Sequence, residues 1–299
     1  MGKRRSDSSR RSRSLRREKG HVVPVPRADR VPAPQSPNAR KSSRSPFPPD
    51  RSREGSTTAP LDSPRPAERS YLDGTYLKHN PTWHAEDADW KAAQIAALLT
   101  KHDLAPAHVV EVGCGSGQVL RALQAQLAPE TLFTGYEIST DAIALARHCE
   151  GERLRVVEGE LTADAGLSDL LLFIDVIEHV EDVFGFLRQH RKRARHLVLH
   201  VPLDLSVQTV LRASPLVDQR RRVGHLHAFT RETLLALLED VGLQVVDWRY
   251  TRGSIELPHY QVGLARWLRW PRRLLAAVDE DVAARVLGGF SMLVLAQPR

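Results

Sequence analysis

The feature that most constrains the fold is a glycine-rich stretch at residues 109–118, which reads VVEVGCGSGQ. An apolar run leads into three glycines at alternate positions, and apolar residues at helical spacing follow from Val119 to Leu127. This order predicts a buried β-strand, a tight turn and the start of a helix. Glycine has no Cβ, so such a turn lets the backbone approach a ligand closely. Nucleotide-like ligands bind at this place in α/β sheets.

Two classes of ligand compete for this turn. A dinucleotide site has the spacing G-x-G-x-x-G, with the pyrophosphate at the helix N-terminus. Here the spacing is G-x-G-x-G, and Gln118 stands where the last dinucleotide glycine belongs. Glu111 lies two residues before the first glycine. A carboxylate repels a phosphate and attracts an ammonium group, so the pattern favours a ligand that carries positive charge.

The stretch resembles the first motif, E/D-x-G-x-G-x-G, of class I methyltransferases that use S-adenosylmethionine (SAM), a ligand with an ammonium and a sulfonium cation. Residues 170–174 form a nearly continuous apolar strand, which is typical of a parallel sheet covered on both faces. The string D-V-I-E-H-V-E-D at residues 175–182 follows it and resembles the fourth motif of type 11 and ubiquinone-pathway-like methyltransferases. The resemblance covers about residues 75–250 and the last strand. It implies an α/β fold: a Rossmann-like, seven-stranded, mostly parallel sheet with helices on both faces and an antiparallel last strand.

A cofactor site follows from the same resemblance. Glu137 ends a predicted strand about 20 residues beyond the glycines, where a carboxylate can accept hydrogen bonds from ribose hydroxyls. The resemblance places Glu160 at the adenine amino group, although the family more often has Asp there. The residues expected to bind SAM are Glu111, Gly113, Cys114, Gly115, Gly117, Glu137, Ile138, Glu160, Asp175 and Val176.

Methyl transfer to a hydroxyl gains from a base, and imidazole titrates near neutral pH. The expected catalytic residues are therefore His179, His225 and His84, although each also fits a structural role. His84 lies in a polar segment before the first core helix, which often covers the cofactor in this family. The pair His225 and His227 could suggest a metal, but neither a cysteine nor a third ligand is near them in sequence, so no metal is expected.

The chain changes in composition near residue 70. Residues 1–70 hold 11 of the 19 prolines and carry 18 basic against 7 acidic residues. This leaves 25 of the 43 basic and 29 of the 36 acidic residues for the remainder, which is slightly acidic. A segment so poor in apolar residues cannot offset its ordering entropy, so we expect a disordered basic tail at 1–70 and a methyltransferase domain at 71–299. The tail is either an arm for nucleic acid or an anionic membrane, or simply solvated.

Residues 251–290 are too long for a hairpin turn and are expected to be a helical insertion, with helices at 262–270 and 274–287. Residues 264–273 mix tryptophans with arginines. That mixture fits a helix at a membrane interface, a contact with an acidic partner, or a lid that packs on the domain.

Three observations bear on the compartment. The sequence has no run of 18 apolar residues, so no membrane span is expected. No apolar segment follows the N-terminal arginines, so no export signal is expected. Cys114 and Cys149 fit neither a disulfide framework nor a zinc site. A reducing cytoplasm is the expected setting.

The function predicted is methyl transfer from SAM to an oxygen or nitrogen of a small-molecule, glycan or lipid-linked acceptor. Two alternatives stay open: an RNA or protein methyltransferase, or nucleic-acid binder, that uses the basic tail, and a non-catalytic interaction protein on the same fold. The absence of an N-P-P-Y motif at residues 175–178 argues against base methylation. The intact Glu111, glycine turn and Glu137 argue against a decayed site.

Overall fold

The computed structural model describes residues 74, 76–77, 80, 82–83, 85–162, 165–260 and 263–299. The expected disorder of residues 1–70 and the expected role of His84 lie outside these residues. The chain divides into two units at Thr58, and everything described belongs to the second unit, Ala59–Arg299.

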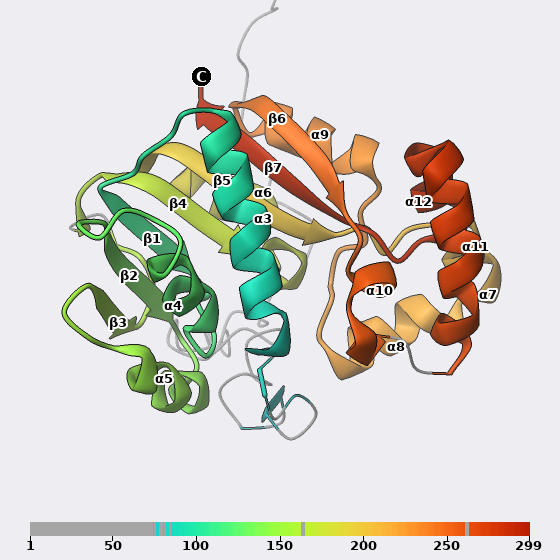
Figure 1. Ribbon diagram of the computed structural model, residues 1–299, viewed down its shortest axis with the longest axis horizontal. Coiled ribbons are helices and arrows are strands. Elements are labelled where there is room, and N and C mark those ends of the chain that lie inside the picture. The colour runs from blue at the N-terminus through green and yellow to red at the C-terminus, as the bar shows by residue number, and fades with distance from the viewer. Residues whose placement is uncertain are drawn as a thin grey trace, which may run out of the picture. The chain divides into compact units, whose positions relative to one another are not determined.

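A single seven-stranded sheet forms the centre of the described unit (Figure 1). The strand order is β3-β2-β1-β4-β5-β7-β6. Strands β1 to β5 pair in parallel, and β7 inserts antiparallel between β5 and β6. The expected Rossmann-like fold with one antiparallel strand is confirmed. The strands are β1 (His108–Val112), β2 (Leu132–Glu137), β3 (Leu154–Glu158), β4 (Ser168–Ile174), β5 (Ala194–Pro202), β6 (Leu243–Thr251) and β7 (Ser291–Pro298).

Helices connect the strands and cover the sheet. The α-helices before β6 are α3 (Ala88–Lys101), α4 (Gln118–Gln124), α5 (Thr140–Ala146), α6 (Val183–His190), α7 (Val207–Arg212), α8 (Ser214–Arg222) and α9 (Arg231–Asp240). Short 3-10 turns are η1 (Ala85–Asp87), η2 (Arg147–Cys149) and η4 (Ile177–His179). Two short polar residues cap helices: the Ser139 side chain accepts the Ala142 N–H before α5, and Thr230 begins α9 with a capping box.

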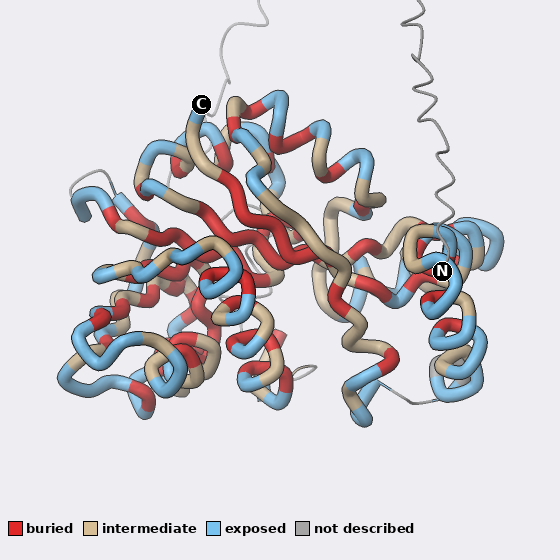
Figure 2. The backbone as a smooth tube through the Cα atoms, turned by 45° about the horizontal axis from the view of Figure 1, so that its top comes forward, coloured by how far each residue is buried: buried red, intermediate tan, exposed pale blue. Residues whose placement is uncertain are grey.

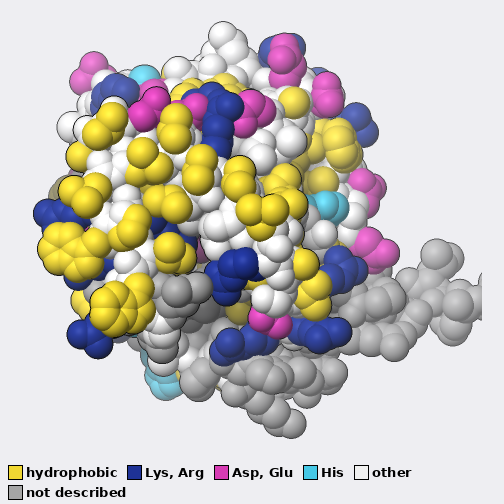
Figure 3. Space-filling model, turned by 90° about the vertical axis from the view of Figure 1, so that its right-hand side faces the viewer, with side chains coloured by type: hydrophobic (Ala, Val, Ile, Leu, Met, Phe, Trp, Pro, Cys, Tyr) yellow, Lys and Arg dark blue, Asp and Glu magenta, His cyan; other side chains and the backbone are white. Residues whose placement is uncertain are grey.

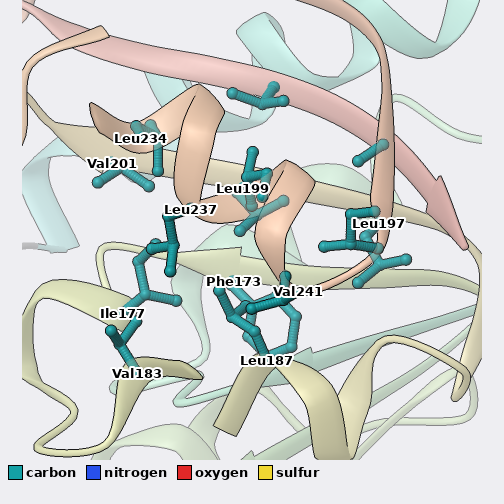
Figure 4. Close-up of a cluster of buried hydrophobic side chains, with 14 of the residues drawn as sticks. Phe173, Ile177, Val183, Leu187, Leu197, Leu199, Val201, Leu234, Leu237 and Val241 are labelled. Carbon is teal, nitrogen blue, oxygen red and sulfur yellow. The ribbon is translucent and has the colours of Figure 1, made fainter. Parts of the chain in front are cut away.

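The two faces of the sheet have separate apolar layers. On one face, Ile95 of α3 and Leu120 of α4 pack on alternate residues of β1, β4 and β7, among them Leu172 of β4. On the other face, α6 and α9 pack on the intervening residues, with Phe173, Leu199 and Leu237 meeting between them (Figure 4). The central strands are consequently buried along most of their length (Figure 2). This explains why β4 is a continuous apolar run rather than an alternating one.

The connection between β6 and β7 contains α10 (Gly253–Glu256), η5 (Pro258–Tyr260), α11 (Leu264–Val278) and α12 (Glu280–Leu287). Its helices close a small apolar cluster of their own around Ile255, Ala283 and Phe290. The helix expected to stop at Trp270 continues through Pro271. Proline removes one backbone hydrogen bond, to the carbonyl of Trp267, and that residue is solvent-exposed, so water can satisfy the carbonyl.

Within the described residues, no helix is both long enough and apolar enough to cross a membrane.

Candidate active site

The glycine turn after β1 adopts a conformation that side chains disfavour. Gly113, Gly115 and Gly117 have φ values of 71°, 53° and 72°. A Cβ on Gly113 would lie 2.8 Å from Val176, and one on Gly115 would lie 2.5 Å from the Trp83 ring. The turn is therefore a backbone cradle that larger residues would block.

Glu137, at the end of β2, is bound to this turn. Its carboxylate accepts the backbone N–H groups of Gly115, Ile138 and Ser139, each at 2.9 Å. Burial raises the pKa of Glu137, and these three N–H groups oppose that shift. A carboxylate has about four acceptor positions, so one remains for a ligand hydroxyl.

Glu111 lies inside β1, almost fully buried, and its Oε2 atom has no hydrogen-bond partner among the described residues. Burial raises its pKa to about 8, although the charge of Lys91 opposes this. A buried carboxyl without a partner is costly unless a donor or a cation meets it. Glu111 is thus suited to receive a positively charged ligand group.

Two cavities adjoin at the carboxyl ends of the parallel strands and share Tyr76, Trp83, Gly113, Asp175 and His179 in their walls. The smaller one has a volume of about 360 Å³ and lies beside the ends of β2 and β3. The larger one, of about 780 Å³, extends towards α7, α8 and α11. Ligands of open α/β sheets bind at this edge.

Most of the predicted cofactor residues gather at these cavities. The smaller cavity is lined by Gly113, Glu137, Ile138, Glu160, Asp175 and Val176. The larger cavity is lined by Glu111, Gly113, Cys114, Gly115 and Asp175. Gly117 lines neither; it begins α4, and a Cβ there would lie 3.3 Å from Ala146. The structure therefore gives Gly117 a packing role.

Asp175 holds a network that the sequence did not reveal. Its Oδ2 lies 2.7 Å from the Lys91 Nζ, and its Oδ1 lies 2.6 Å from Nδ1 of His200. His200 also contacts the Thr251 hydroxyl at 2.9 Å. Burial favours the neutral acid, but the charges of Lys91 and His200 outweigh it and hold the pKa of Asp175 well below its usual range. Both oxygens of Asp175 are thus engaged by protein groups.

A second polar cluster forms where η4 meets the loop before α9. The His179 and His225 rings pack edge to face with centroids 4.8 Å apart, and the Nε2 of His179 is 3.9 Å from the Oε1 of Glu178. The His225 Nδ1 is 2.5 Å from the carboxylate of Asp204. Glu178 is fully buried, and neither of its carboxylate oxygens has a hydrogen-bond partner among the described residues. Two of the three predicted histidines therefore lie together on the wall of the larger cavity.

The structure does not test the expectation of no metal, but one premise of that expectation does not hold in space. The expectation rested on the lack of a third ligand near His225, yet Glu178 and His179 lie beside it in space, all three ligand atoms within 4.8 Å of one another. About 45 residues separate the two segments in sequence. The fold joins them because both follow parallel strands at the same edge of the sheet.

Sequence reasoning also missed Lys91, His200 and Asp204. His200 and Asp204 had a usable signal, because polar residues that interrupt or directly follow an apolar strand lie at the ligand edge of a parallel sheet. Lys91 had none: it is one of several charged residues on α3, and only the packing of that helix buries it.

The family model described as "Methyltransferase domain" matches residues 83–247 of the chain. This is more than half of the chain, and it contains the glycine turn, Glu137 and the polar cluster at η4. The chain belongs to this methyltransferase-domain family, and the class that its fold and site define is the SAM-dependent methyltransferase.

Solved structures with the same fold include the following three. One is the protein described as "the putative methyltransferase" in complex with the Haloferax volcanii Trm112 methyltransferase activator, at 17% identity and TM-score 0.54, covering 77% of this chain and 96% of that chain. The plantazolicin methyltransferase BpumL, with a desmethylplantazolicin analogue and S-adenosylhomocysteine (SAH), has 15% identity, TM-score 0.51 and coverages of 78% and 94%. The N-methyltransferase NodS of Bradyrhizobium japonicum, with SAH, has 17% identity, TM-score 0.50 and coverages of 78% and 98%. Among curated proteins, no sequence matches the chain.

Proposed function

We propose that the protein transfers the methyl group of SAM to an oxygen or nitrogen of a small-molecule, glycan or lipid-linked acceptor. The observation that carries this proposal is the pair of buried carboxyls, Glu111 and Glu137, beside a glycine turn at the junction of two cavities. Glu111 suits the ammonium group at one end of SAM, and Glu137 suits a ribose hydroxyl towards the other end.

The proposed cofactor position spans both cavities. Glu111 receives the ammonium group, and the cradle of Gly113 and Gly115 admits the methionine portion past the backbone. Glu137 accepts a ribose hydroxyl at its remaining position, and Glu160 on the wall of the smaller cavity meets the adenine. Asp175 supports this arrangement indirectly by fixing Lys91 and His200.

When bound, SAM supplies an electrophilic methyl group on a sulfonium. The protein aligns the acceptor with that carbon, which can contribute on the order of 7–11 kcal/mol. In the simplest form of the reaction, His225 takes the acceptor's proton at Nε2, because Asp204 receives a hydrogen bond from its Nδ1. His179 packs against the same ring and limits its orientation.

An exposed stripe on α11 favours a lipid-linked acceptor within this range. Trp267, Trp270, Leu274 and Val278 are 77%, 62%, 68% and 85% exposed, and they recur at helical spacing on one side of the helix. The opposite side contributes Leu268 and Arg272 to the wall of the larger cavity. Hydrophobic and basic side chains intermingle on this side of the molecule (Figure 3). Such a surface suits an anionic lipid bilayer, which would bring a lipid-linked acceptor to the cavity.

Vesicle sedimentation tests the lipid surface. We expect the full chain to sediment with vesicles that contain phosphatidylglycerol, and the double variant Trp267→Ser/Trp270→Ser to lose at least about fivefold in affinity. The matched control is Phe184→Ser, which removes an exposed aromatic residue from α6. Equal sedimentation of all three proteins would remove the lipid surface from the account.

Transfer of labelled methyl groups tests the reaction. The full chain is incubated with methyl-tritiated SAM and with separated cell fractions of lipids, small polar molecules, RNA and protein. Label in the lipid or small-molecule fraction, abolished by Glu137→Gln, is the expected result. Label confined to RNA or protein would support the first alternative above, and no transfer to any fraction would support a non-catalytic role.

A further inference from the structure

Among the described residues, Glu178, His179 and His225 form one group of side chains that could hold a metal ion. Each offers one ligand atom, and these atoms lie within 4.8 Å of one another. All three residues line the larger cavity, and His225 is the residue proposed above to take the acceptor's proton.

Backbone hydrogen bonds hold the two segments of this group together. The N–H groups of Leu226 and His227 donate to the carbonyl of Glu178 at 2.7 and 3.1 Å. These two bonds hold the loop before α9 against η4. They fix the position of His225 relative to Glu178 and His179 although about 45 residues separate the two segments.

The Glu178 carboxyl group is buried without a hydrogen-bond partner among the described residues. Its side chain is 0% exposed, and neither oxygen has a hydrogen-bond partner. A cation between Glu178 and the two imidazoles would satisfy its oxygens and offset the cost of burying it.

His225 is already oriented as a ligand. Its Nδ1 donates to the Asp204 carboxylate at 2.5 Å, which leaves Nε2 with a lone pair for a metal. A hydrogen bond from the other ring nitrogen to a carboxylate is usual for histidines that bind a metal. Metal bonds of about 2.1 Å require ligand atoms roughly 3–4 Å apart. The 3.9 Å between His179 Nε2 and Glu178 Oε1 meets that requirement. The ligand atoms of all three residues lie within 4.8 Å of one another.

We propose that Glu178, His179 and His225 bind a divalent transition-metal ion at the acceptor site. Two imidazoles and one carboxylate suit Mn²⁺, Fe²⁺, Co²⁺ or Zn²⁺ better than Mg²⁺ or Ca²⁺, which prefer oxygen ligands. Three protein ligands leave coordination positions open towards the cavity. The proposal rests on the function proposed above and narrows its acceptor to a hydroxyl compound.

Methyl transfer from SAM to a hydroxyl coordinated at this site needs no further reactant. A coordinated hydroxyl loses its proton to solvent near neutral pH, because the cation stabilises the oxygen anion. That oxygen then forms the bond to the methyl carbon while the carbon–sulfur bond breaks and leaves its electron pair on sulfur. His225 serves as a ligand here, and the cation replaces it as the group that promotes proton loss.

Calorimetric titration of Co²⁺ and of Mn²⁺ into the chelator-treated full chain tests the site. We expect one saturable site per chain, with a visible absorption band for Co²⁺ that reports nitrogen and oxygen ligands. Glu178→Gln and His225→Ala should each weaken binding at least tenfold, and Asp204→Asn about 10–100-fold through loss of the second partner. The matched control is His227→Ala, because His227 bonds to the Val180 carbonyl and lies outside the group.

Thermal unfolding of each variant checks that it is folded, and Asp204→Asn stands in for any ligand variant that is not. Absence of saturable binding, or binding that the ligand variants leave unchanged, would overturn the metal site. SAM titrated into the same chelator-treated protein separates this failure from that of the proposed function. Retained SAM binding without metal binding leaves the methyltransferase account intact, whereas loss of both contradicts both.

Discussion

At the scale of single residues, the site is a set of buried carboxyl groups that differ in their ion-pair and hydrogen-bond partners. Asp175 pairs with Lys91 and His200, and Glu137 accepts hydrogen bonds from three backbone N–H groups. Glu111 and Glu178 keep oxygens without partners among the described residues. Glu111 and Glu178 are the carboxyl groups to which we assign ligands, and the titration of Glu111 makes its own assignment testable.

Glu111 predicts a pH dependence of SAM affinity. Its pKa of about 8 means that it holds a proton below that pH, and an ammonium group placed beside it favours the carboxylate. Binding therefore releases a proton, so affinity should rise with pH by up to about tenfold per unit between pH 6 and 7.5, where an α-amino group stays largely protonated. Glu111→Gln should bind more weakly and with a flat profile in calorimetry. An unchanged slope in that variant would contradict the role of Glu111.

The same group predicts a dependence of stability on pH. A carboxyl with a raised pKa binds more protons folded than unfolded between about pH 4.5 and 8, so its contribution to the free energy of unfolding falls as pH rises through that window. Glu111→Gln should remove this decline, gaining on the wild type by on the order of a few kcal/mol between pH 5 and 8. Denaturant unfolding without SAM measures the difference, and parallel curves for the two proteins would be the contrary result.

Gly115 predicts a steric effect on the cradle. Alanine there would have to adopt φ near 53°, at a cost of about 1–2 kcal/mol, with its Cβ 2.5 Å from the Trp83 ring. We expect Gly115→Ala to lower the unfolding temperature and to weaken SAM binding at least tenfold. Gly151→Ala is the control, since a Cβ there meets nothing within 4 Å. Equal SAM affinity in the two variants would show that the cradle tolerates a side chain.

At the scale of elements, local sequence patterns predicted the helices and strands better than they predicted the contacts of single residues. The strand at β4 follows from an apolar run, and the caps of α5 and α9 follow from short polar side chains. The antiparallel last strand was implied by the family resemblance and not by a local pattern. The course of α11 through Pro271 does not follow from a local pattern either, because tertiary context and solvent decide whether a proline ends a helix. Contacts between distant elements, such as His225 with η4, had no local signal at all.

The connection between β6 and β7 is anchored on the start of α3. Tyr260 donates to the buried carboxylate of Asp87, and the Trp90 indole donates to Glu256 at 2.8 Å. Tyr260→Phe should lower the free energy of local opening at residues 253–260 by about 1–3 kcal/mol. Amide hydrogen exchange measures this. Tyr250→Phe, which loses a bond to Asp281 instead, should leave those amides unchanged, and equal effects of the two variants would contradict the anchor.

At the scale of the whole molecule, two adjoining cavities divide the work. The smaller is formed by the strand ends that the family motif marks, and these were predictable from the sequence. The larger also contains Glu111 and the glycine turn of the first motif, but it draws further walls from α7, α8 and α11, which lie outside the recognisable motifs or in the inserted connection. The cofactor could therefore be predicted and the acceptor could not, because the motifs contain the groups that meet the cofactor and few of those that face the acceptor.

The central claim is that the glycine turn and Glu137 bind SAM, and calorimetric titration of SAM into the full chain tests it most directly. The wild type and Glu158→Gln, an exposed acid on the neighbouring strand, should show one saturable site of equal affinity. Glu137→Gln should bind at least tenfold more weakly, because its amide group cannot accept the same hydrogen bonds. No binding by folded wild-type protein, or equal binding by all three proteins, would contradict the account.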